Sequence, residues 1–435
     1  MPSTQADRLL AKIEDASARV ALIGQGYVGL PVAMRAAALG FPVVGYDVSQ
    51  TRIDALAAGR SYVEDISDDD VGRALAGGYK PTADPADLAG FDIAVITVPT
   101  PLRENAPDLS FVESATRALV PHLRPGVLVI LESTTYPGTT TELMLPVLET
   151  WGLKVGVDLF VGYSPERIDP GNPTWNLVNT PKVVSGVEEH SLRLVSAFYG
   201  RLCERVVEVG STAEAELVKL LENTFRHVNI ALVNELAMFA RDLGVNIWSA
   251  IDAASTKPYG FMRFTPGPGV GGHCLPIDPS YLSWQVKRQL GHSFRFVELA
   301  NDVNEHMPEY VVDRIVALLN RDRLAVNGTK ILLLGLAYKA GTSDVRESPS
   351  LLVADRLAAM GAELSACDPF VPDVNLQSTD LQMVDFSADA LATADLVVLL
   401  VDHPGFDLDV IASASTRVFD TRGALRGRTF NGETL

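Results

Sequence analysis

The feature that most constrains this fold is a glycine-rich turn near the start of the chain. Residues 19–24 read RVALIG, a continuous apolar run typical of a strand buried on both faces of a parallel sheet. The sequence G-x-G-x-x-G follows at Gly24, Gly26 and Gly29, and residues 28–39 have helical composition. In such a turn the first glycine allows the bend, the second lets a pyrophosphate approach the backbone, and the third lets helix and strand pack closely. Glycine-rich turns also occur for packing reasons alone, so the context has to decide.

The context favours a dinucleotide. The second predicted strand, residues 42–47, ends on Asp47, about 20 residues beyond the turn. A carboxylate there can accept hydrogen bonds from the adenosine ribose and repels a 2′-phosphate, while the pyrophosphate would lie on the helix N-terminus. Arg52 is a nearby cation that could tolerate the extra phosphate of NADP. We expect NAD as the cofactor.

Strands and helices alternate on both sides of a helical region. Residues 51–58 look helical, and 91–98 and 127–131 look like further strands. Long helices are predicted at 214–243 and about 294–319, separated by a Pro/Gly-rich loop at 257–279. Alternation then resumes with strands at 330–335, 362–367 and 396–401 and a helix at 348–360. The pattern predicts an α/β fold of two Rossmann-like, doubly wound domains joined by a central helical domain.

With 435 residues, the chain is too long for one ordinary domain. We expect an N-terminal NAD-binding Rossmann-like domain at 1–213, a central helical domain at 214–320, and a C-terminal Rossmann-like domain at 321–435.

Charge and cysteine content exclude several classes of protein. The chain has 36 Lys and Arg against 54 Asp and Glu, a formal net charge of -18, which disfavours binding to nucleic acid or to an anionic membrane. Three scattered cysteines cannot form a disulfide framework or a zinc knuckle. No signal peptide or membrane-spanning run is evident, so a cytoplasmic location is expected.

Two further patterns carry candidate chemistry. Cys274 lies among glycines and could be reached by a ligand, with Asp278 placed to orient a water; a buried thiol in a tight turn is the plainer interpretation. His273 is interpreted as structural, because no second ligand stands at zinc spacing. On the long helix, polar residues recur at i+3 and i+4 and share one face, which is either a solvated stripe or a set of groups projecting into a cleft. These residues are Glu216, Lys219, Asn223 and His227.

Several longer stretches occur in a fixed order along the chain. They are GQGYVGLP at 24–31, VPTPL at 98–102, STTYPGT at 133–139, GYSPERIDPGN at 162–172, E-x-x-K-x-x-x-N at 216–223, NE at 234–235, PGPGVGGHCLPID at 266–278 and K-x-x-T-x-D-x-R-E-S-P at 339–349. By these stretches the chain resembles, from end to end, the UDP-glucose/GDP-mannose dehydrogenase family of nucleotide-sugar 6-dehydrogenases. Several long motifs in the correct order are far more specific than any one of them.

The resemblance implies a four-electron oxidation that uses two NAD+. The C6 alcohol of the sugar becomes an aldehyde, is trapped by a cysteine, is oxidised again to a thioester, and is hydrolysed to a carboxylate. By motif match, Cys274 is the nucleophile. Lys219 stabilises the alkoxide and the thiohemiacetal oxyanion, with Asn223 as a second donor.

The other expected roles also follow from the resemblance. Asp278 and Thr134 hold the hydrolytic water, and Glu166 is the base in the thioester step. Lys339 matches a sugar-nucleotide contact of the C-terminal domain, and Arg346 an NAD contact. The expected cofactor contacts are Gly24, Gly26, Tyr27, Val28, Gly29, Asp47, Arg52, Pro99, Thr100, Thr134 and Arg346. The expected substrate contacts are Glu166, Arg167, Lys219, Asn223, Arg263, Gly271 and Lys339. A homodimer through the central helices is expected, and no metal site.

Two departures bear on the sugar. Many UDP-glucose dehydrogenases carry a lysine where this chain has Ile277 and a glutamate where it has Pro170, so the nicotinamide contacts of that branch do not transfer. The loops 162–172 and 266–278 look more like the branch that acts on UDP-N-acetylhexosamines, with UDP-N-acetylglucosamine as the expected substrate. Arg167, Asn172 and Arg263 are candidate partners of a 2-acetamido group. UDP-glucose, UDP-N-acetylmannosamine and GDP-mannose are the alternatives.

Two other classes of protein remain to be compared. A two-electron hydroxyacid dehydrogenase shares the N-terminal and helical domains but needs neither Cys274 nor a second Rossmann-like half. A non-catalytic NAD-binding protein has no use for a nucleophile, and the set formed by Lys219, Asn223, Cys274 and Asp278 argues against it.

Overall fold

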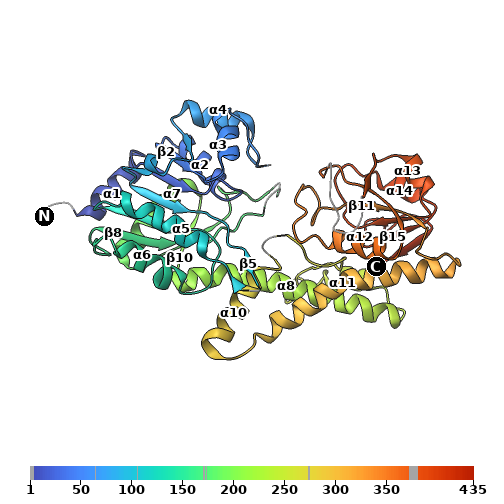
Figure 1. The fold of residues 1–435 in the computed structure, drawn as a ribbon. Coiled ribbons are helices and arrows are strands. Elements are labelled where there is room, and N and C mark those ends of the chain that lie inside the picture. Colours follow the sequence, from blue (N-terminus) through green and yellow to red (C-terminus); the bar gives the residue numbers. More distant parts are fainter. Residues whose placement is uncertain are drawn as a thin grey trace. The chain divides into compact units, whose positions relative to one another are not determined.

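The structure is a computed structural model that describes residues 4–63, 65–104, 106–169, 172, 174–272, 275–371 and 381–435. The chain divides into two compact units, residues 1–222 and 223–435. Figure 1 shows the order of the elements along the chain. Among the described residues no helix is long and apolar enough to cross a membrane.

The first unit contains an eight-stranded sheet with the order β10-β9-β8-β7-β4-β1-β2-β3. Neighbouring strands pair in parallel except β8 and β9, which are antiparallel. The bounds are β1 Val20–Ile23, β2 Val43–Tyr46, β3 Lys80–Thr82, β4 Ile93–Ile96, β7 Val127–Leu131, β8 Leu159–Tyr163, β9 Lys182–Gly186 and β10 Val206–Glu208. A small antiparallel ribbon joins β5 (Leu102–Arg103) to β6 (Ala106–Pro107).

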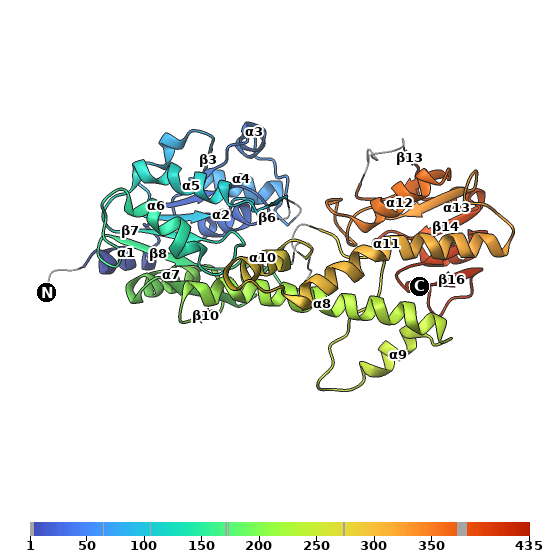
Figure 2. The ribbon, with the colours of Figure 1, turned by 60° about the horizontal axis from the view of Figure 1, so that its bottom comes forward.

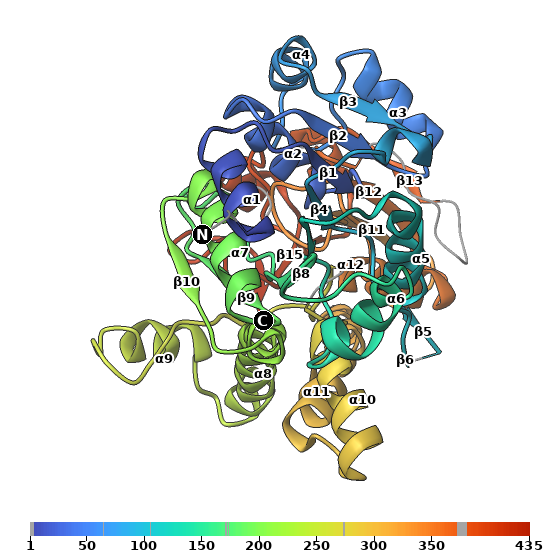
Figure 3. The same ribbon diagram turned by 90° about the vertical axis from the view of Figure 1, so that its left-hand side faces the viewer.

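Helices cover both faces of this sheet because its strands are apolar on both sides. Alternate residues such as Val20, Leu22 and Ile93 pack into one core with α1, α2 and α7. Figure 3 shows α5 and α6 on the other side of the strands. The bounds are α1 Gln5–Glu14, α2 Gly29–Ala38, α3 Gln50–Ala57, α4 Asp68–Ala76, α5 Ser110–Leu119, α6 Leu145–Glu149 and α7 Glu189–Leu202, with short turns of other helix types at η1 Pro85–Leu88, η2 Val120–His122 and η3 Thr140–Met144.

The predicted long helices are present. Helix α8 runs without a break over Thr212–Asp242, and Figure 2 shows it followed by α9 (Ile247–Ala254). Helix α10 (Asp278–Leu290) leads into α11 (Arg295–Arg321). Pro308 lies inside α11 and has no N–H to donate to the carbonyl of Asn304, and a Cβ on Gly269 would lie 3.1 Å from that carbonyl oxygen.

The second unit repeats the order of six strands of the first, β3-β2-β1-β4-β7-β8. Its six-stranded sheet is entirely parallel, in the order β13-β12-β11-β14-β15-β16. One face packs on α11 and α12, and the other on α13 and α14. The bounds are β11 Lys330–Leu334, β12 Glu363–Cys367, β13 Gln382–Met383, β14 Leu396–Leu399, β15 Val418–Asp420, β16 Gly432–Thr434, α12 Pro349–Ala359, α13 Ala388–Thr393 and α14 Leu408–Ala414.

The repeat extends to single residues. In each unit a carboxylate follows the second strand of the Rossmann-like order and accepts a backbone N–H from the turn after the first strand. In the first unit Asp47 accepts from Gln25 at 2.8 Å, and in the second Asp368 accepts from Leu336 at 2.7 Å. The expected fold class, two Rossmann-like domains with helices between them in sequence, is confirmed. The predicted domain limits at 213 and 320 remain predictions.

Candidate active site

The glycine turn has the geometry that a pyrophosphate needs. Gly24 has φ +97°, and an added Cβ would lie 2.8 Å from the carbonyl oxygen of Thr97. A Cβ on Gly29 would lie 2.0 Å from the carbonyl oxygen of Gly24. Gly26 has open space around the position of a Cβ. The first and third glycines are therefore required by packing, while the second leaves the backbone accessible where α2 begins.

Asp47 completes the dinucleotide site. Its side chain is almost fully buried at the end of β2 and accepts hydrogen bonds from the backbone N–H groups of Gln25 and Ser49, each at 2.8 Å. The guanidinium of Arg52 lies 3.3 Å from the same carboxylate and is half exposed. The carboxylate is thus fixed beside the glycine turn, where a ribose hydroxyl would be expected.

The remaining predicted NAD contacts follow neighbouring strands. Tyr27 and Val28 lie in the glycine turn, Pro99 and Thr100 follow β4, and Thr134 follows β7. Because β7, β4, β1 and β2 are adjacent and parallel, their carboxyl ends bring these residues to one edge of the sheet. The residues of this edge fit NAD.

Glu216 attaches the loop that carries Thr134 to helix α8. Its buried carboxylate accepts hydrogen bonds from the backbone N–H of Gly138 at 2.6 Å, the backbone N–H of Thr140 at 2.8 Å and the hydroxyl of Thr140 at 2.6 Å. Burial raises the pKa of Glu216 to about 7, although these hydrogen bonds oppose the shift. Glu216 is therefore a buried anchor and no part of a solvated stripe.

Lys219 and Asn223 lie on the same face of α8, one turn apart, and both are buried. The ammonium of Lys219 donates to the backbone carbonyl of Glu166 at 2.6 Å. The amide of Asn223 donates to the carboxylate of Asp278 at 2.5 Å, and Asp278 is the first residue of α10. The polar face of α8 is thus buried against specific partners and is not a solvated stripe, and its part in a substrate site stays a prediction.

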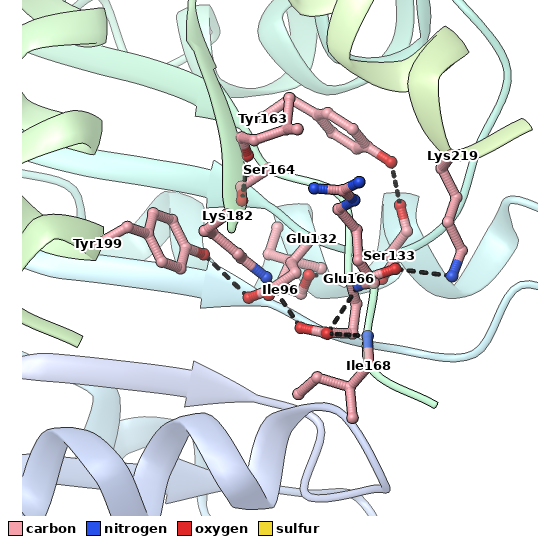
Figure 4. Close-up of polar contacts among 12 residues, drawn as sticks. Ile96, Glu132, Ser133, Tyr163, Ser164, Glu166, Ile168, Lys182, Tyr199 and Lys219 are labelled. Atoms are coloured by element: carbon pink, nitrogen blue, oxygen red, sulfur yellow. Dashed lines mark hydrogen bonds and ion pairs between the residues drawn. The ribbon is translucent and has the colours of Figure 1, made fainter. Parts of the chain in front are cut away.

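The side chain of Glu166 belongs to a buried cluster that Figure 4 shows. One carboxylate oxygen accepts the backbone N–H groups of Arg167 and Ile168, each at 2.7 Å. The other lies 2.8 Å from the ammonium of Lys182. Burial opposes ionisation of Glu166, but the ammonium of Lys182, the neighbouring Glu132 and the N–H of Ile168 outweigh it and lower the pKa of Glu166 to about 2.

The predicted sugar-loop residues have local partners. Arg167 forms an ion pair with Glu222 at 2.5 Å, and Arg263 forms one with Asp252 at 2.6 Å. The side-chain oxygen of Asn172 accepts the backbone N–H groups of residues 174 and 175. These contacts hold the side chains in place and leave their predicted part in sugar binding a prediction.

The glycine-rich loop before Cys274 packs closely on the segment that contains Lys339 and Arg346. A Cβ on Gly271 would lie 2.6 Å from the carbonyl oxygen of Glu347, and one on Gly272 would lie 2.7 Å from the ring of Tyr338. The N–H of Gly272 donates to the carbonyl of Arg346 at 3.0 Å. These two glycines are needed because a larger residue would collide with the neighbouring segment, and not because they expose the thiol of Cys274. His273 and Cys274 lie outside the described residues, as does Pro170.

In the same segment, the guanidinium of Arg346 binds both oxygens of Asp344, at 2.6 to 3.1 Å, and is half exposed. Lys339 lies beside the ring of Tyr338. Its predicted contact with the sugar nucleotide stays a prediction.

Sequence reasoning missed Glu132, Lys182 and Tyr199, which surround the carboxylate of Glu166. The available signals were weak: Glu132 directly follows the apolar run of β7, and Lys182 opens the apolar strand β9. A charged residue at the end of a strand is more often exposed, and here all three side chains are buried. Among the described residues no group of His, Cys, Asp and Glu is arranged to hold a metal ion.

Comparison with known proteins identifies the domains. The NAD binding domain of the UDP-glucose/GDP-mannose dehydrogenase family matches residues 18–203, its central domain residues 213–306, and its UDP binding domain residues 332–427. A UDP-N-acetyl-D-mannosamine dehydrogenase of Pyrococcus horikoshii is 37% identical over 393 residues, covering 89% of this chain and 90% of the relative. The enzyme of that name from Escherichia coli K12 is 36% identical over 406 residues, covering 89% and 94%.

A solved structure agrees with these matches. The structure of the UDP-D-ManNAc dehydrogenase from Pyrococcus horikoshii has a TM-score of 0.85 and 36% identity, and it covers 95% of this chain and 98% of its own. The sequence matches, the fold and the glycine turn agree on an NAD-dependent enzyme with a nucleotide-sugar substrate. The chain belongs to the UDP-glucose/GDP-mannose dehydrogenase family.

Proposed function

We propose that this protein oxidises the C6 alcohol of a UDP-N-acetylhexosamine to the carboxylate, with UDP-N-acetyl-D-mannosamine as the substrate. The loops 162–172 and 266–278 indicate an acetamido sugar, and the sequence analysis expects UDP-N-acetylglucosamine. The similar proteins reported above are instead named UDP-N-acetyl-D-mannosamine dehydrogenases. The two sugars differ only in configuration at C2 and carry the same acetamido group. The proposal therefore keeps the acetamido sugar and changes the C2 epimer.

The observation that carries the proposal is the buried polar face of α8. Lys219 is a buried ammonium that donates to a neutral carbonyl, so its positive charge is available to a developing oxyanion. Asn223 is fixed one turn later by Asp278. A helix face of this kind holds an ammonium, an amide and a carboxylate in place before the substrate binds, which lowers the reorganisation needed in the transition state.

The proposed chemistry has four stages. NAD+ supplies the hydride acceptor for both oxidations. Lys219 stabilises the alkoxide as the C6 alcohol loses its proton to solvent, and the alkoxide would become an aldehyde by giving a hydride to bound NAD+. The thiolate of Cys274 then adds to the aldehyde. Lys219 and Asn223 hold the resulting oxyanion, whose carbon loses the second hydride to give a thioester. Water held by Asp278 and Thr134 adds to the thioester and releases the thiol and the carboxylate.

A panel of nucleotide sugars tests the substrate. NADH formation is measured with UDP-N-acetylmannosamine, UDP-N-acetylglucosamine and UDP-glucose under identical conditions. We expect the highest kcat/KM with UDP-N-acetylmannosamine and a kcat/KM roughly tenfold or more lower with UDP-glucose. Protein groups that bind the acetamido group would be left unpaired by glucose, at a cost of roughly 1–3 kcal/mol each. A preference for UDP-glucose contradicts the acetamido proposal and leaves the family unchanged.

Stoichiometry and a cysteine variant test the route. Each sugar oxidised should yield two NADH, and a released aldehyde with one NADH would reject the thioester route. Cys274→Ala should abolish acid formation while sugar-nucleotide binding, measured by calorimetry, is kept, because the nucleophile acts after binding. Cys367→Ala removes a buried thiol of the C-terminal domain and serves as the control. Full activity of Cys274→Ala would show that the thiol is only structural.

We further propose a homodimer formed through α8. Large apolar side chains remain exposed along this helix at intervals of three, four and seven residues, which places them on one stripe. They are Leu217, Leu221, Phe225, Leu232, Leu236 and Phe239, with Leu243 just beyond the end of the helix. A second copy of the same helix is the partner that a self-complementary apolar stripe would bury.

A further inference from the structure

The carboxylate of Glu166 is one member of a three-charge cluster that lies entirely inside the first unit. Glu132, directly after β7, forms an ion pair with Lys182, the first residue of β9. Lys182 also binds Glu166 at 2.8 Å, and Tyr199 on α7 donates its hydroxyl to Glu132 at 2.9 Å. The side chains of Lys182 and Glu132 are 3% and 0% exposed, so water cannot screen their charges.

The charges in the cluster do not balance if both carboxyl groups are ionised. One ammonium then faces two carboxylates, which leaves a net negative charge in the protein interior. Both carboxyl groups bind the same ammonium, so they lie close together in the interior, and a proton on one of them would remove the excess negative charge. Burial raises the pKa of Glu132 to about 7, with Lys182 opposing the shift and Glu166 adding to it.

Other charged groups near the cluster do not supply the missing charge. Burial raises the pKa of Cys203 to about 11 and that of Tyr199 well above its usual value, so both remain neutral near pH 7. Arg35 donates to the carbonyl of Leu202, and the guanidinium of Arg167 pairs with Glu222. Lys219 donates to the backbone carbonyl oxygen of Glu166 and not to its carboxylate.

The cluster is connected to the proposed catalytic ammonium through a single residue. Figure 4 shows that Glu166 binds Lys182 through its side chain and Lys219 through its backbone carbonyl. If the side chain of Glu166 lost its cation, residue 166 would lose an anchor, and the carbonyl that holds Lys219 would lose its fixed place. The effect of Lys182 on the reaction would therefore pass through the backbone of residue 166.

We propose that Lys182 and Glu132 are positioning residues of the active site: Glu132 takes up a proton towards neutral pH, Lys182 neutralises Glu166, and the neutral cluster fixes the residue that holds Lys219. In this arrangement Glu166 acts chiefly as an anchor. The inference rests on the proposed function for its kinetic consequence, while its charge balance can be measured without any substrate.

The first experiment measures thermal stability against pH for the wild type and Glu132→Gln. The glutamine amide reproduces the protonated carboxyl at every pH. We expect equal effects of both side chains near pH 4, and a Tm of Glu132→Gln that exceeds the wild-type value increasingly from about pH 4.5 to 7 and by a constant amount above about pH 7. Glu113→Gln changes an exposed ion pair with Arg117 in the same unit and is the matched control. A Tm difference that does not change with pH would contradict the uptake of a proton by Glu132.

The second experiment measures kcat, KM and NAD+ binding with the sugar nucleotide that the panel identifies. Lys182→Met should lower kcat at least tenfold, while the Kd for NAD+ changes less than threefold. Glu132→Gln should keep kcat within threefold at pH 7 and lose any fall of kcat that deprotonation of Glu132 causes between pH 6 and 8. Lys12→Met, which removes an exposed partner of Asp92, is the control for loss of a lysine.

The outcomes separate the two proposals. Wild-type kcat in Lys182→Met, or a loss in Glu132→Gln at pH 7 as large as that in Lys182→Met, overturns the positioning role. If Lys182→Met does not fold, the Tm profile of Glu132→Gln still decides the charge balance. Absence of NADH formation by the wild type with every sugar would reject the proposed function and leave the Tm profile as the test of the cluster.

Discussion

At the scale of single residues, the chain uses buried carboxylates to hold backbone in place. Asp47 fixes the glycine turn, Glu216 fixes the loop at 133–140, and Asp368 fixes the turn after β11. In each case a carboxylate accepts backbone N–H groups that would otherwise have no partner inside the protein. Fixing the backbone in this way is a precondition for placing a cofactor or a nucleophile to within a fraction of an ångström.

Asp47 should set the choice between NAD+ and NADP+. Asp47→Ala removes the ribose acceptor and frees Arg52, which lies 3.3 Å from the carboxylate, to attract a 2′-phosphate. A hydrogen bond to a charged group is worth roughly 1.5–3 kcal/mol, so the ratio of kcat/KM for NAD+ over NADP+ should fall about tenfold or more. Asp54→Ala changes an exposed aspartate on the next helix and should leave the ratio unchanged. An unchanged ratio in Asp47→Ala would mean that another residue sets the choice.

Glu216 should make the protein less stable as the pH rises from about 5 to 7. The pKa of Glu216 is raised by burial from 4.5 to about 7, so between these values the unfolded chain releases a proton that the folded chain keeps. The free energy of unfolding then falls with pH by roughly 3 kcal/mol in total and is constant above about pH 7. Burial shifts Glu132 in the same direction. Urea unfolding at pH 5, 6, 7 and 8 measures the slope, and stability that increases over this range would contradict it.

At the scale of elements, the glycine-rich loop is fixed by a buried polar contact between helices. Asn234 on α8 accepts the N–H of Gly267 at 3.0 Å and donates to Asn304 on α11 at 2.9 Å. Asn304 in turn donates to the carbonyl of His227. The loop that leads to Cys274 is thus attached to two helices at once.

Asn234→Ala should therefore affect both stability and rate. The variant leaves the Gly267 N–H and the Asn304 side chain without these partners, at a cost of roughly 2–4 kcal/mol. We also expect a lower kcat with little change in the Kd for NAD+, because the loop before the nucleophile loses an anchor. Asn229→Ala, which removes a bond to the backbone of the same helix, is the control. Equal effects of the two variants on kcat would exclude a special role for Asn234.

The elements that the sequence predicts well are those encoded locally. The turn at Gly24, the apolar strand β7 and the unbroken helix α8 each follow from neighbouring residues. The antiparallel pairing of β8 with β9 depends on contacts between distant segments, and no local pattern indicates it. The cluster at Glu166 could not be predicted from the sequence for the same reason, since Glu132 and Lys182 are 50 residues apart in the chain.

At the scale of the whole molecule, the second unit repeats the strand order of the first without its glycine fingerprint. Gly335 has φ +87° and its Cβ would lie 2.5 Å from Val401, so it matches the packing role of Gly24. Beyond it the chain has no counterpart of Gly26. The repeat explains how one architecture can present two nucleotide-binding edges, one of which matches an NAD binding domain and the other a UDP binding domain.

The proposed dimer can be tested on the apolar stripe of α8. A Leu232→Glu and Leu236→Glu double variant places two charges where the second copy would pack, and it should convert a dimer to a monomer in light scattering. Leu352→Glu changes an exposed leucine of α12 and should leave the mass unchanged. A wild-type protein that is monomeric at micromolar concentration would reject the proposal.

Helix α8 also restricts how the length of this chain can vary. Each residue of an α-helix turns the chain by about 100° and advances it by about 1.5 Å. Glu216, Lys219 and Asn223 share a face only because the number of residues between them is fixed. A loop absorbs an inserted residue by bulging, whereas a helix passes the rotation on to everything that follows. An insertion of one residue between 219 and 223 would keep every proposed catalytic side chain and still separate the ammonium from the amide by about a quarter of a turn.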